Sequence, residues 1–431
     1  MKKQLFFLIS LFGCLTLFAQ DNHTYKLTPS EVEALFLQQN LELIAERMNI
    51  NIADAEIVQA KLWENPTLEI SEVNLWSTKS QRDGESFPPL FGSFGKNTQF
   101  SVELSQLIQT AHKRGKLIAR ERASKDIAIQ EFEVLLQGLK VELRKSMNEI
   151  DYLQCYLNVL SGQEKSLIQL VEAYRRQVEH GNIAKAELLR LQSSLLETQN
   201  EINETSVDLN EQVKTLKTLL SVDPMVHIEI VNINNTPINP ELLSLSELLV
   251  KTLDYKADVK LSKLQVKLAD KSLRYEKSQR APDITVSASY DRFGGIWKDF
   301  IGFGVSIDLP LFNRNQGGIK GARFTQIQAQ YQEQQQINLA QHEVVEAYNN
   351  YLQSYNFYQK VNSNDLLSEL DGMLAVYAKN LLNRNISMLE YIDFVEAYKT
   401  TKQTVLMAQK NMQTQFEDLQ YMVGKDLNKA L

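Results

Sequence analysis

The spacing of hydrophobic residues changes from a helical period to a period of two at two places along this chain. A helical spacing of apolar residues predicts one helix over 28–64, with Thr28 heading a capping box, and another over 244–279. Each predicted helix ends at a proline, Pro66 or Pro282, which cannot continue the hydrogen bonding of a helix. Extended chain is therefore expected after each proline.

Alternating apolar and polar or small residues follow each proline, and this period of two predicts strands with one apolar face. The alternation is clearest over 99–105 and over 301–309. Each of these segments has a preceding segment that can pair with it. Two β-hairpins are therefore predicted, over 67–108 and 283–309.

The predicted strands are long enough to cross a membrane. Each has about 10 to 12 residues, close to the roughly 9 to 11 that a tilted membrane strand needs. Trp76 and Trp297 lie toward the hairpin loops, as aromatic residues at a membrane interface do. A water-soluble sandwich with buried tryptophans is the alternative that the strands alone leave open.

Long helices are predicted after each hairpin. Residues 113–179 hold isolated glycines and no proline, so a single helix of about 100 Å is expected there. Apolar residues over 157–178 and 188–209 alternate spacings of three and four, which is typical of coiled-coil packing. The second half repeats this pattern from about 316 to about 423. We expect these rods to lie side by side.

A sequence repeat relates the two halves. Residues 174–198 return as 377–401, a constant 203 positions later (377 − 174). Each copy contains residues that tolerate a left-handed backbone, around Gly181 in the first and around Arg384 in the second. Because such residues end helices, we predict a helical hairpin with a tip near 181 and another with a tip near 384.

The repeat sets the predicted domain organisation. A first structural repeat is expected over 20–220, a crossover linker over 221–243 and a second structural repeat over 244–431. Residues 1–19 have a basic start, an apolar run and a cleavage site after Ala19, which predicts a signal peptide. A lipoprotein signal at Cys14 is the alternative.

Charge and motif content argue against two classes of function, nucleic-acid binding and catalysis. The formal net charge of −7 argues against a nucleic-acid partner. The five histidines show no ligand spacing to a carboxylate or thiol, and no phosphate loop or nucleophile elbow is present. We therefore expect that the protein is not an enzyme. We also expect no catalytic residue, no cofactor and no metal site.

Four amphipathic strands cannot lie in lipid alone, because their edge amides would lack hydrogen-bond partners. Eight strands from two copies would be filled by side chains, whereas twelve strands from three copies leave a lumen. The predicted fold is mainly α with a small membrane β part. A long coiled-coil α-helical barrel is continued by a 12-stranded β-barrel, formed by a trimer with four strands per chain and a two-fold internal repeat.

Two segments carry a resemblance to a known family. The run over 103–116, Glu-Leu-Ser-Gln-Leu-Ile-Gln-Thr-Ala-His-Lys-Arg-Gly-Lys, resembles a strand-to-helix corner of the TolC-like outer-membrane efflux factors, particularly their heavy-metal cation branch. Residues 307–312, with Gly317 and Gly318 behind them, resemble the other corner. The resemblance implies a passive, homotrimeric exit duct in outer-membrane lipid that extends into the periplasm. It would receive metal cations, or drugs, from an inner-membrane pump through a periplasmic adaptor (membrane fusion protein).

The same resemblance implies a periplasmic aperture. In this family acidic residues just after the second tip ring the entrance, and the matching residues here are Glu390 and Asp393. The repeat places Glu187 at the position of Glu390 and Arg190 at that of Asp393. Our hypothesis is an acidic ring that Arg190 helps to hold shut. The alternative is that these are solvated charges near the tips.

The tips themselves are the predicted adaptor contacts, since exposed turns are where such contacts form. The residues are Gly181, Asn182, Ile183, Arg384, Asn385 and Ile386. Simple helix termination is the alternative role. The rival function is a periplasmic coiled-coil adaptor or scaffold protein without a membrane barrel, which would need only one hairpin and no strand pairs of this kind.

Overall fold

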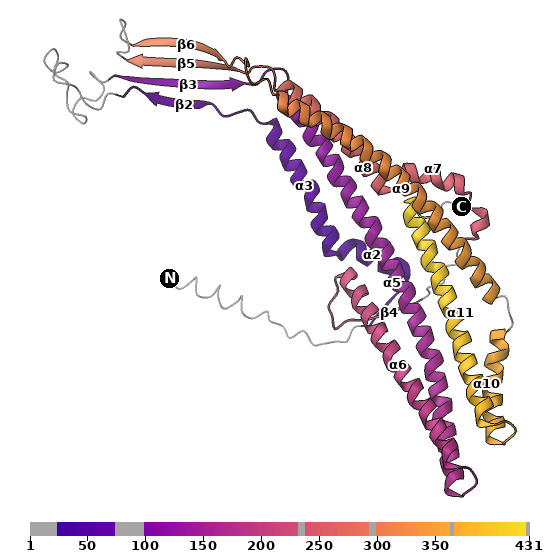
Figure 1. Cartoon of the computed structure of the whole chain (residues 1–431). Helices are drawn as coiled ribbons and strands as arrows, with labels where there is room; N and C mark the ends of the chain where they lie inside the picture. Colours follow the sequence, from indigo (N-terminus) through magenta and orange to yellow (C-terminus); the bar gives the residue numbers. More distant parts are fainter. Residues whose placement is uncertain (1–23, 74–98, 232–237, 293–298, 363–365, 428–431) are drawn as a thin grey trace, which may run out of the picture. The chain divides into compact units, whose positions relative to one another are not determined.

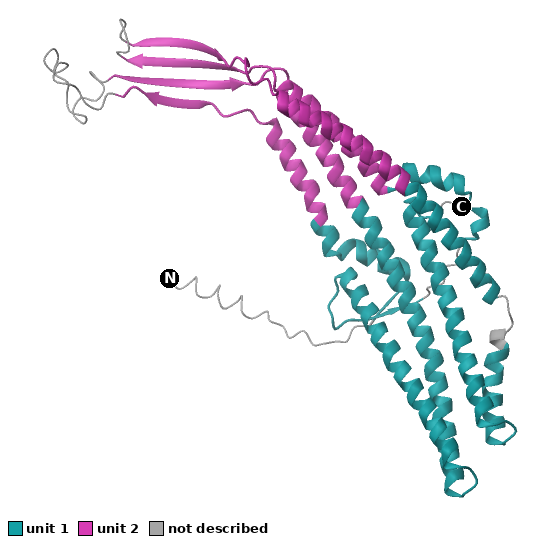
Figure 2. Ribbon diagram, viewed as in Figure 1, with its two compact units in different colours: residues 1–45, 134–256, 340–431 teal, residues 46–133, 257–339 magenta. Residues whose placement is uncertain are grey.

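The computed structural model describes residues 24–73, 99–231, 238–292, 299–362 and 366–427. The predicted signal peptide over 1–19, with Cys14, lies outside these residues, as do Trp76 and Trp297. The chain divides into two compact units (Figure 2). Unit 1 comprises Met1–Ala45, Val134–Lys256 and Ala340–Leu431, and unit 2 comprises Glu46–Glu133 and Ala257–Leu339. Each unit thus takes segments from both predicted repeats.

Unit 2 contains a four-stranded antiparallel sheet (Figure 1). The strands are β2 (Thr67–Ser71), β3 (Phe100–Ile108), β5 (Ile284–Arg292) and β6 (Phe300–Ile307), in the order β2-β3-β5-β6. The strand pairs β2/β3 and β5/β6 confirm the two predicted hairpins, and the pairing of β3 with β5 joins the two halves of the sequence.

The strands are shorter than predicted, with 5, 9, 9 and 8 residues. In the first hairpin, Glu72 has a positive φ of 55°, a conformation that ends an extended strand. In the second, Pro310 has no amide hydrogen for a ladder. The first strand therefore ends at Ser71, and the last ends at Ile307, before the predicted end at 309.

Helices precede and follow each pair of strands. The elements α3 (Leu41–Lys61), α5 (Lys113–Glu179), α8 (Ala257–Ser278) and α9 (Gln316–Asn362) each contribute residues to both units. Within unit 2, ion pairs connect them: Lys125 Nζ to Asp54 at 2.7 Å, Lys267 Nζ to Asp126 at 2.7 Å, and Lys113 Nζ to Asp283 at 2.7 Å. The last pair fixes the start of α5 to the residue before β5.

The predicted helices over 28–64 and 244–279 are each interrupted. The first is split into α2 (Pro29–Gln39) and α3, and the second into α7 (Leu245–Tyr255) and α8. At the first break Asn40 donates from Nδ2 to the carbonyl of Leu219 at 2.8 Å, and at the second Lys256 pairs with Glu343. Neither break contains glycine or proline, and at the first one Asn40 also accepts from Leu43 N at 2.8 Å, which caps α3. The predicted start is confirmed, since Thr28 and Glu31 form the capping box.

Unit 1 is built on helical hairpins. The helix α5 has 67 residues, about 100 Å, and returns as α6 (Lys185–Leu220). In the second half α10 (Leu366–Leu382) returns as α11 (Met388–Val423) (Figure 1). Charged pairs join α5 and α6 to α11: Arg144–Glu417 at 2.8 Å, Lys145–Asp418 at 2.5 Å, Lys410–Glu149 at 3.1 Å and Lys399–Glu201 at 3.0 Å.

The predicted linker over 221–243 contains a strand and a short helix. The strand β4 (His227–Ile230) pairs in parallel with β1 (Thr24–Leu27), a pairing that the sequence analysis missed. The 3₁₀ helix η1 (Pro240–Leu242) follows. The buried Tyr351 of α9 donates its hydroxyl to the carbonyl of Ile238 and so holds the linker against this helix.

Candidate functional site

The two helical tips have the same backbone geometry. Gly181 has a φ of 71° and Arg384 a φ of 60°, and these residues are 203 positions apart (384 − 181). A hydrogen bond that spans five residues closes each turn: Asn182 N to Gln177 O at 2.8 Å, and Asn385 N to Asn380 O at 2.9 Å. Such a bond across a left-handed residue is the Schellman ending of a helix. A left-handed residue therefore ends the helix at each tip.

The return helices begin differently. The helix α6 starts after Ala184, which provides no side-chain cap, whereas α11 starts after Ser387, which forms a capping box with Glu390. The Glu390 carboxylate accepts from the Ser387 amide at 2.7 Å and from its hydroxyl at 2.9 Å. These bonds, the backbone one foremost, lower the pKa of the fully exposed Glu390. Its carboxylate is thus held at the helix start as an anion.

A hydrogen bond connects the two tips directly. The Arg384 guanidinium donates from Nη2 to the backbone carbonyl of Asn182 at 2.6 Å. Both residues are exposed, and both were predicted as adaptor contacts. The second tip is therefore bound to the first through a charge-assisted hydrogen bond.

An apolar core lies behind the tips. It contains buried residues from both hairpins: Leu167, Leu170, Val171, Tyr174, Leu188, Leu191, Leu381, Met388, Tyr391 and Val395. The half-buried Ile183 and Ile386, one from each tip, pack against it. Because both hairpins share this core, the two tips of one chain are held together by burial as well as by Arg384.

The four predicted aperture residues lie on the first two turns of α6 and α11. Glu390, Asp393 and Arg190 are exposed, and Glu187 is half-buried. Burial, followed by the charge of Glu187, raises the pKa of Tyr174, which places Glu187 near the apolar core. Among the residues that the structure describes, no ion pair links Arg190 to Glu187, Glu390 or Asp393. A ring would have to be completed by further copies.

The sheet of unit 2 has one apolar and one polar face. Cross-strand partners share a face, and the apolar ladders include Ile70–Val102–Tyr290–Ile301 and Leu68–Leu104–Ala288–Phe303. Between them lies the ladder Glu69–Glu103–Ser289–Gly302. Like charges directly opposite each other destabilise a sheet unless water solvates them. The apolar face therefore suits lipid, and the polar face suits an aqueous lumen.

The edges of this sheet are open. β2 and β6 are the outer strands, and neither pairs with another strand in the described part of the chain. An unpaired edge cannot lie in hydrocarbon, because each bare amide there costs several kcal/mol. β2 and β6 run in opposite directions, so β6 of one copy can pair with β2 of another in antiparallel fashion.

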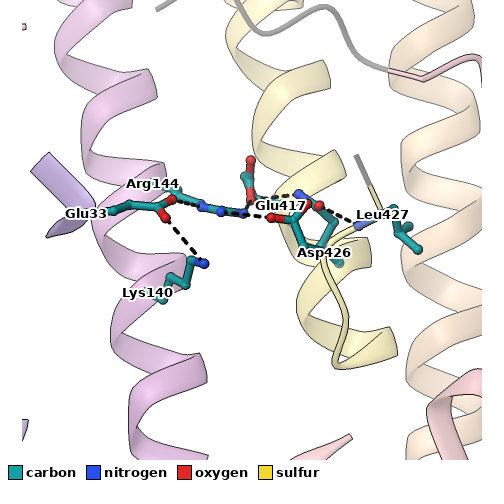
Figure 3. Close-up of polar contacts among 7 residues, drawn as sticks. Glu33, Lys140, Arg144, Glu417, Asp426 and Leu427 are labelled. Carbon is teal, nitrogen blue, oxygen red and sulfur yellow. Dashed lines mark hydrogen bonds and ion pairs between the residues drawn. The ribbon is translucent and has the colours of Figure 1, made fainter. Parts of the chain in front are cut away.

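A charged cluster in unit 1 was not predicted. Figure 3 shows Arg144 of α5 between Glu33 of α2 and two acidic residues near the end of α11. The distances are 2.6 Å to Glu33, 2.8 Å to Glu417 and 3.4 Å to Asp426, and Lys140 lies 3.3 Å from Glu33. Residues so far apart in sequence give no local signal of such a cluster.

Opposing effects set the pKa values in this cluster. Burial raises the pKa of Glu33, but the hydrogen bond and charge of Arg144 and the charge of Lys140 outweigh it, so the pKa is lowered. For Glu417 burial prevails over Arg144, and the pKa is raised. Glu33 is thus a stabilising anion, whereas Glu417 is a carboxylate whose charge is costly to bury.

None of the described helices combines the length and apolar character needed to span a membrane. The sequence profile of the Outer membrane efflux protein family matches residues 34–222. A search of curated proteins found no match.

Solved structures share this fold. The CmeC outer membrane channel of Campylobacter jejuni aligns with a TM-score of 0.73 at 13% identity, over 96% of this chain and 93% of that chain. The outer membrane protein VceC of Vibrio cholerae aligns with a TM-score of 0.70 at 15% identity, over 92% and 96%. CusC, whose structures concern transmembrane channel formation, aligns with a TM-score of 0.70 at 16% identity, over 94% of each chain.

These likenesses establish the fold of the chain as that of the outer-membrane channels, which combine an α-helical barrel with a β-barrel. The predicted fold class is confirmed at that level. Together with the family match they support the predicted location in the outer membrane with an extension into the periplasm.

Proposed function

We propose that this chain is a member of the Outer membrane efflux protein family and forms the channel component of a tripartite efflux system. The observation that carries the proposal is an amphipathic sheet with two open edges, attached to two helical hairpins whose tips match in geometry. The family match over 34–222 supports it. Such a channel carries out no chemistry and serves as a passive exit duct.

The channel is a homotrimer in this proposal. Four strands per chain require partners, and three copies give twelve strands, which leave a lumen. The apolar ladders would face lipid, and the Glu69–Glu103 pairs would face water. The oligomeric state of the protein in detergent tests this step.

The tips of α5/α6 and α10/α11 form the periplasmic entrance in this proposal. In a trimer, Glu390 and Asp393 of three chains would line the aperture, with Glu187 and Arg190 close by. Like charges a few ångströms apart repel by about 1 to 4 kcal/mol, depending on screening. The capping bonds of Ser387 support this arrangement because they keep Glu390 ionised.

The exposed tips are the docking surface for a periplasmic adaptor, which links the channel to an inner-membrane pump. Cysteines at Lys185 and Leu389, both exposed, would report on docking by crosslinking to a co-expressed adaptor. Met388, the counterpart of Lys185 in the repeat, is buried and unsuitable for this purpose. Crosslinks at these sites, and none from an exposed control cysteine at Glu211, would support docking at the tips.

The proposed cargo is heavy-metal cations, since the corner over 103–116 resembles the metal branch of the family. Drugs are the second candidate. A strain that lacks this chain would lose resistance to metal salts if the first is correct, and resistance to dyes and detergents if the second is.

A coiled-coil adaptor or scaffold without a membrane barrel is the rival function. In a protein of that kind nothing would cover the apolar face of the sheet, where Ile301, Phe303 and Val305 are all exposed in a single chain. A barrel in lipid accounts for that exposure directly.

A further inference from the structure

A short apolar segment follows β6 and is exposed almost completely. Leu309 is 71% exposed, Leu311 62% and Phe312 93%. This segment, residues 309–312, lies at the helix-side end of the open edge strand β6 and precedes α9. An aromatic side chain can bury roughly 150–250 Å², so exposure of this kind indicates a surface that a partner covers.

A pocket of about 450 Å³ lies beside the start of the other edge strand, β2. Its lining includes Leu62, Trp63, Leu107, His112, Arg114 and Ile118, all within unit 2. Leu107 occupies a position on the otherwise polar face of β3, where it contributes apolar surface to the pocket. Trp63 is itself 62% exposed, so the mouth of the pocket presents apolar surface to solvent.

The strand directions place both features at the same end of the sheet. Ile108, Ile284 and Ile307 lie opposite one another at that end, and β2 also begins there. When β6 of one copy pairs with β2 of the next, the residues after β6 come beside the residues before β2. The exposed segment of one copy then meets the pocket of its neighbour.

Charge complementarity supports the same contact. The Arg114 guanidinium lies 3.8 Å from the centre of the Trp63 ring, and its Nη1 is buried without a hydrogen-bond partner among the described residues. Asp308, which directly precedes the segment, is exposed and has no ion pair in the described part of the chain. A carboxylate beside this guanidinium would give Arg114 the acceptor that one chain alone does not provide.

We propose that residues 309–312 of one copy dock in the Trp63 pocket of the next copy around the ring, with Asp308 next to Arg114. The proposal rests on the proposed three-copy barrel. The contact lies where strand becomes helix, so it continues the interface between copies beyond the last hydrogen bonds of the β6–β2 pair.

Cysteine crosslinking in the full-length protein, in a Cys155→Ser background, tests the contact. Trp63→Cys combined with Phe312→Cys should give crosslinked dimers and trimers with a short thiol-specific reagent, and neither single variant should. Trp63→Cys with Phe324→Cys is the matched control, because Phe324 is also exposed but lies further along α9. That pair should not crosslink.

A second set of variants separates this contact from the barrel itself. Leu68→Cys on β2 is combined in turn with Ile301→Cys, Phe303→Cys and Val305→Cys on β6, which covers shifts of register. Crosslinks in this set without a Trp63–Phe312 crosslink would overturn the docking and leave the barrel intact. Crosslinks in neither set would overturn both. Crosslinks in both sets are the expected result.

Discussion

The guanidinium of Arg384 donates a 2.6 Å hydrogen bond to the backbone carbonyl of Asn182, so the second helical tip is fastened to the first. The same arginine occupies the left-handed position of its own turn, with a φ of 60°. One residue therefore ends a helix and joins two hairpins.

Replacing Arg384 by glycine separates these two roles. Glycine keeps the left-handed turn and relieves its strain, so the variant loses the link to Asn182 while the helix ending is preserved. We expect Arg384→Gly to raise the single-channel conductance of reconstituted protein several-fold, because the tips lose a charge-assisted bond. Arg384→Ala also removes the guanidinium but keeps the backbone strain that any residue with a Cβ carries at this φ, so it serves as the comparison. A conductance equal to wild type in Arg384→Gly would show that the link does not constrain the entrance.

If the aperture is acidic, the preference of the channel for cations should depend on its charge and should weaken as salt screens that charge. Asp393→Asn should lower the preference of the channel for cations at low ionic strength, and the difference should shrink in 1 M salt, where the screening length is about 3 Å. Asp393 is the better choice than Glu390, whose carboxylate also caps α11. Glu211→Gln, an exposed charge far along α6, is the control. Identical ion selectivity in wild type and Asp393→Asn would count against the ring.

Replacing Arg144 should cause a large loss of stability. Arg144→Met leaves Glu33, Glu417 and Asp426 without their shared cation, and breaking a buried ion pair in this way costs about 3–5 kcal/mol. Arg175→Met on the same helix removes an exposed pair with Glu172 and should cost about 0–1 kcal/mol. Denaturant unfolding of both variants measures the two losses, and similar values would mean that the cluster is not important for stability.

The pKa shifts in the cluster predict opposite pH effects. The lowered pKa of Glu33 means that its contribution to stability is present above the unfolded pKa and is lost as pH falls through the folded pKa. The raised pKa of Glu417 means that its charge opposes folding above the raised value, and that this cost declines as pH falls below it and is gone below the unfolded pKa.

Melting temperatures measured between pH 7 and pH 3 test the direction of the two pH effects. The stability of wild type relative to Glu33→Gln should fall on acidification, whereas its stability relative to Glu417→Gln should rise. If both differences change in the same direction, the assignment of the two shifts is incorrect.

The features that the sequence predicted depend on local rules. The alternation over 99–105 and 301–309 predicted β3 and β6, because side chains on a strand alternate between two faces. Gly181 predicted the first tip and Asn383 and Asn385 the second, because few residue types tolerate a left-handed backbone. In the second tip it is Arg384, between the two asparagines, that adopts this conformation.

The features that the sequence did not predict depend on distant contacts. Asn40 is an N-cap residue, and its Oδ1 accepts from Leu43 N at 2.8 Å, but the sequence gives no sign that its Nδ2 donates to Leu219 on α6. The pairing of β1 with β4 and the cluster around Arg144 likewise join segments more than 100 residues apart. Such contacts depend on how whole helices and strands pack, and the spacing of residues along the sequence does not predict them.

Native mass spectrometry of the detergent-solubilised protein tests the central claim most directly. The account predicts a particle of three chains that requires detergent to stay in solution, because only association closes the sheet edges β2 and β6. A compact monomer that stays soluble without detergent and binds no micelle would contradict it.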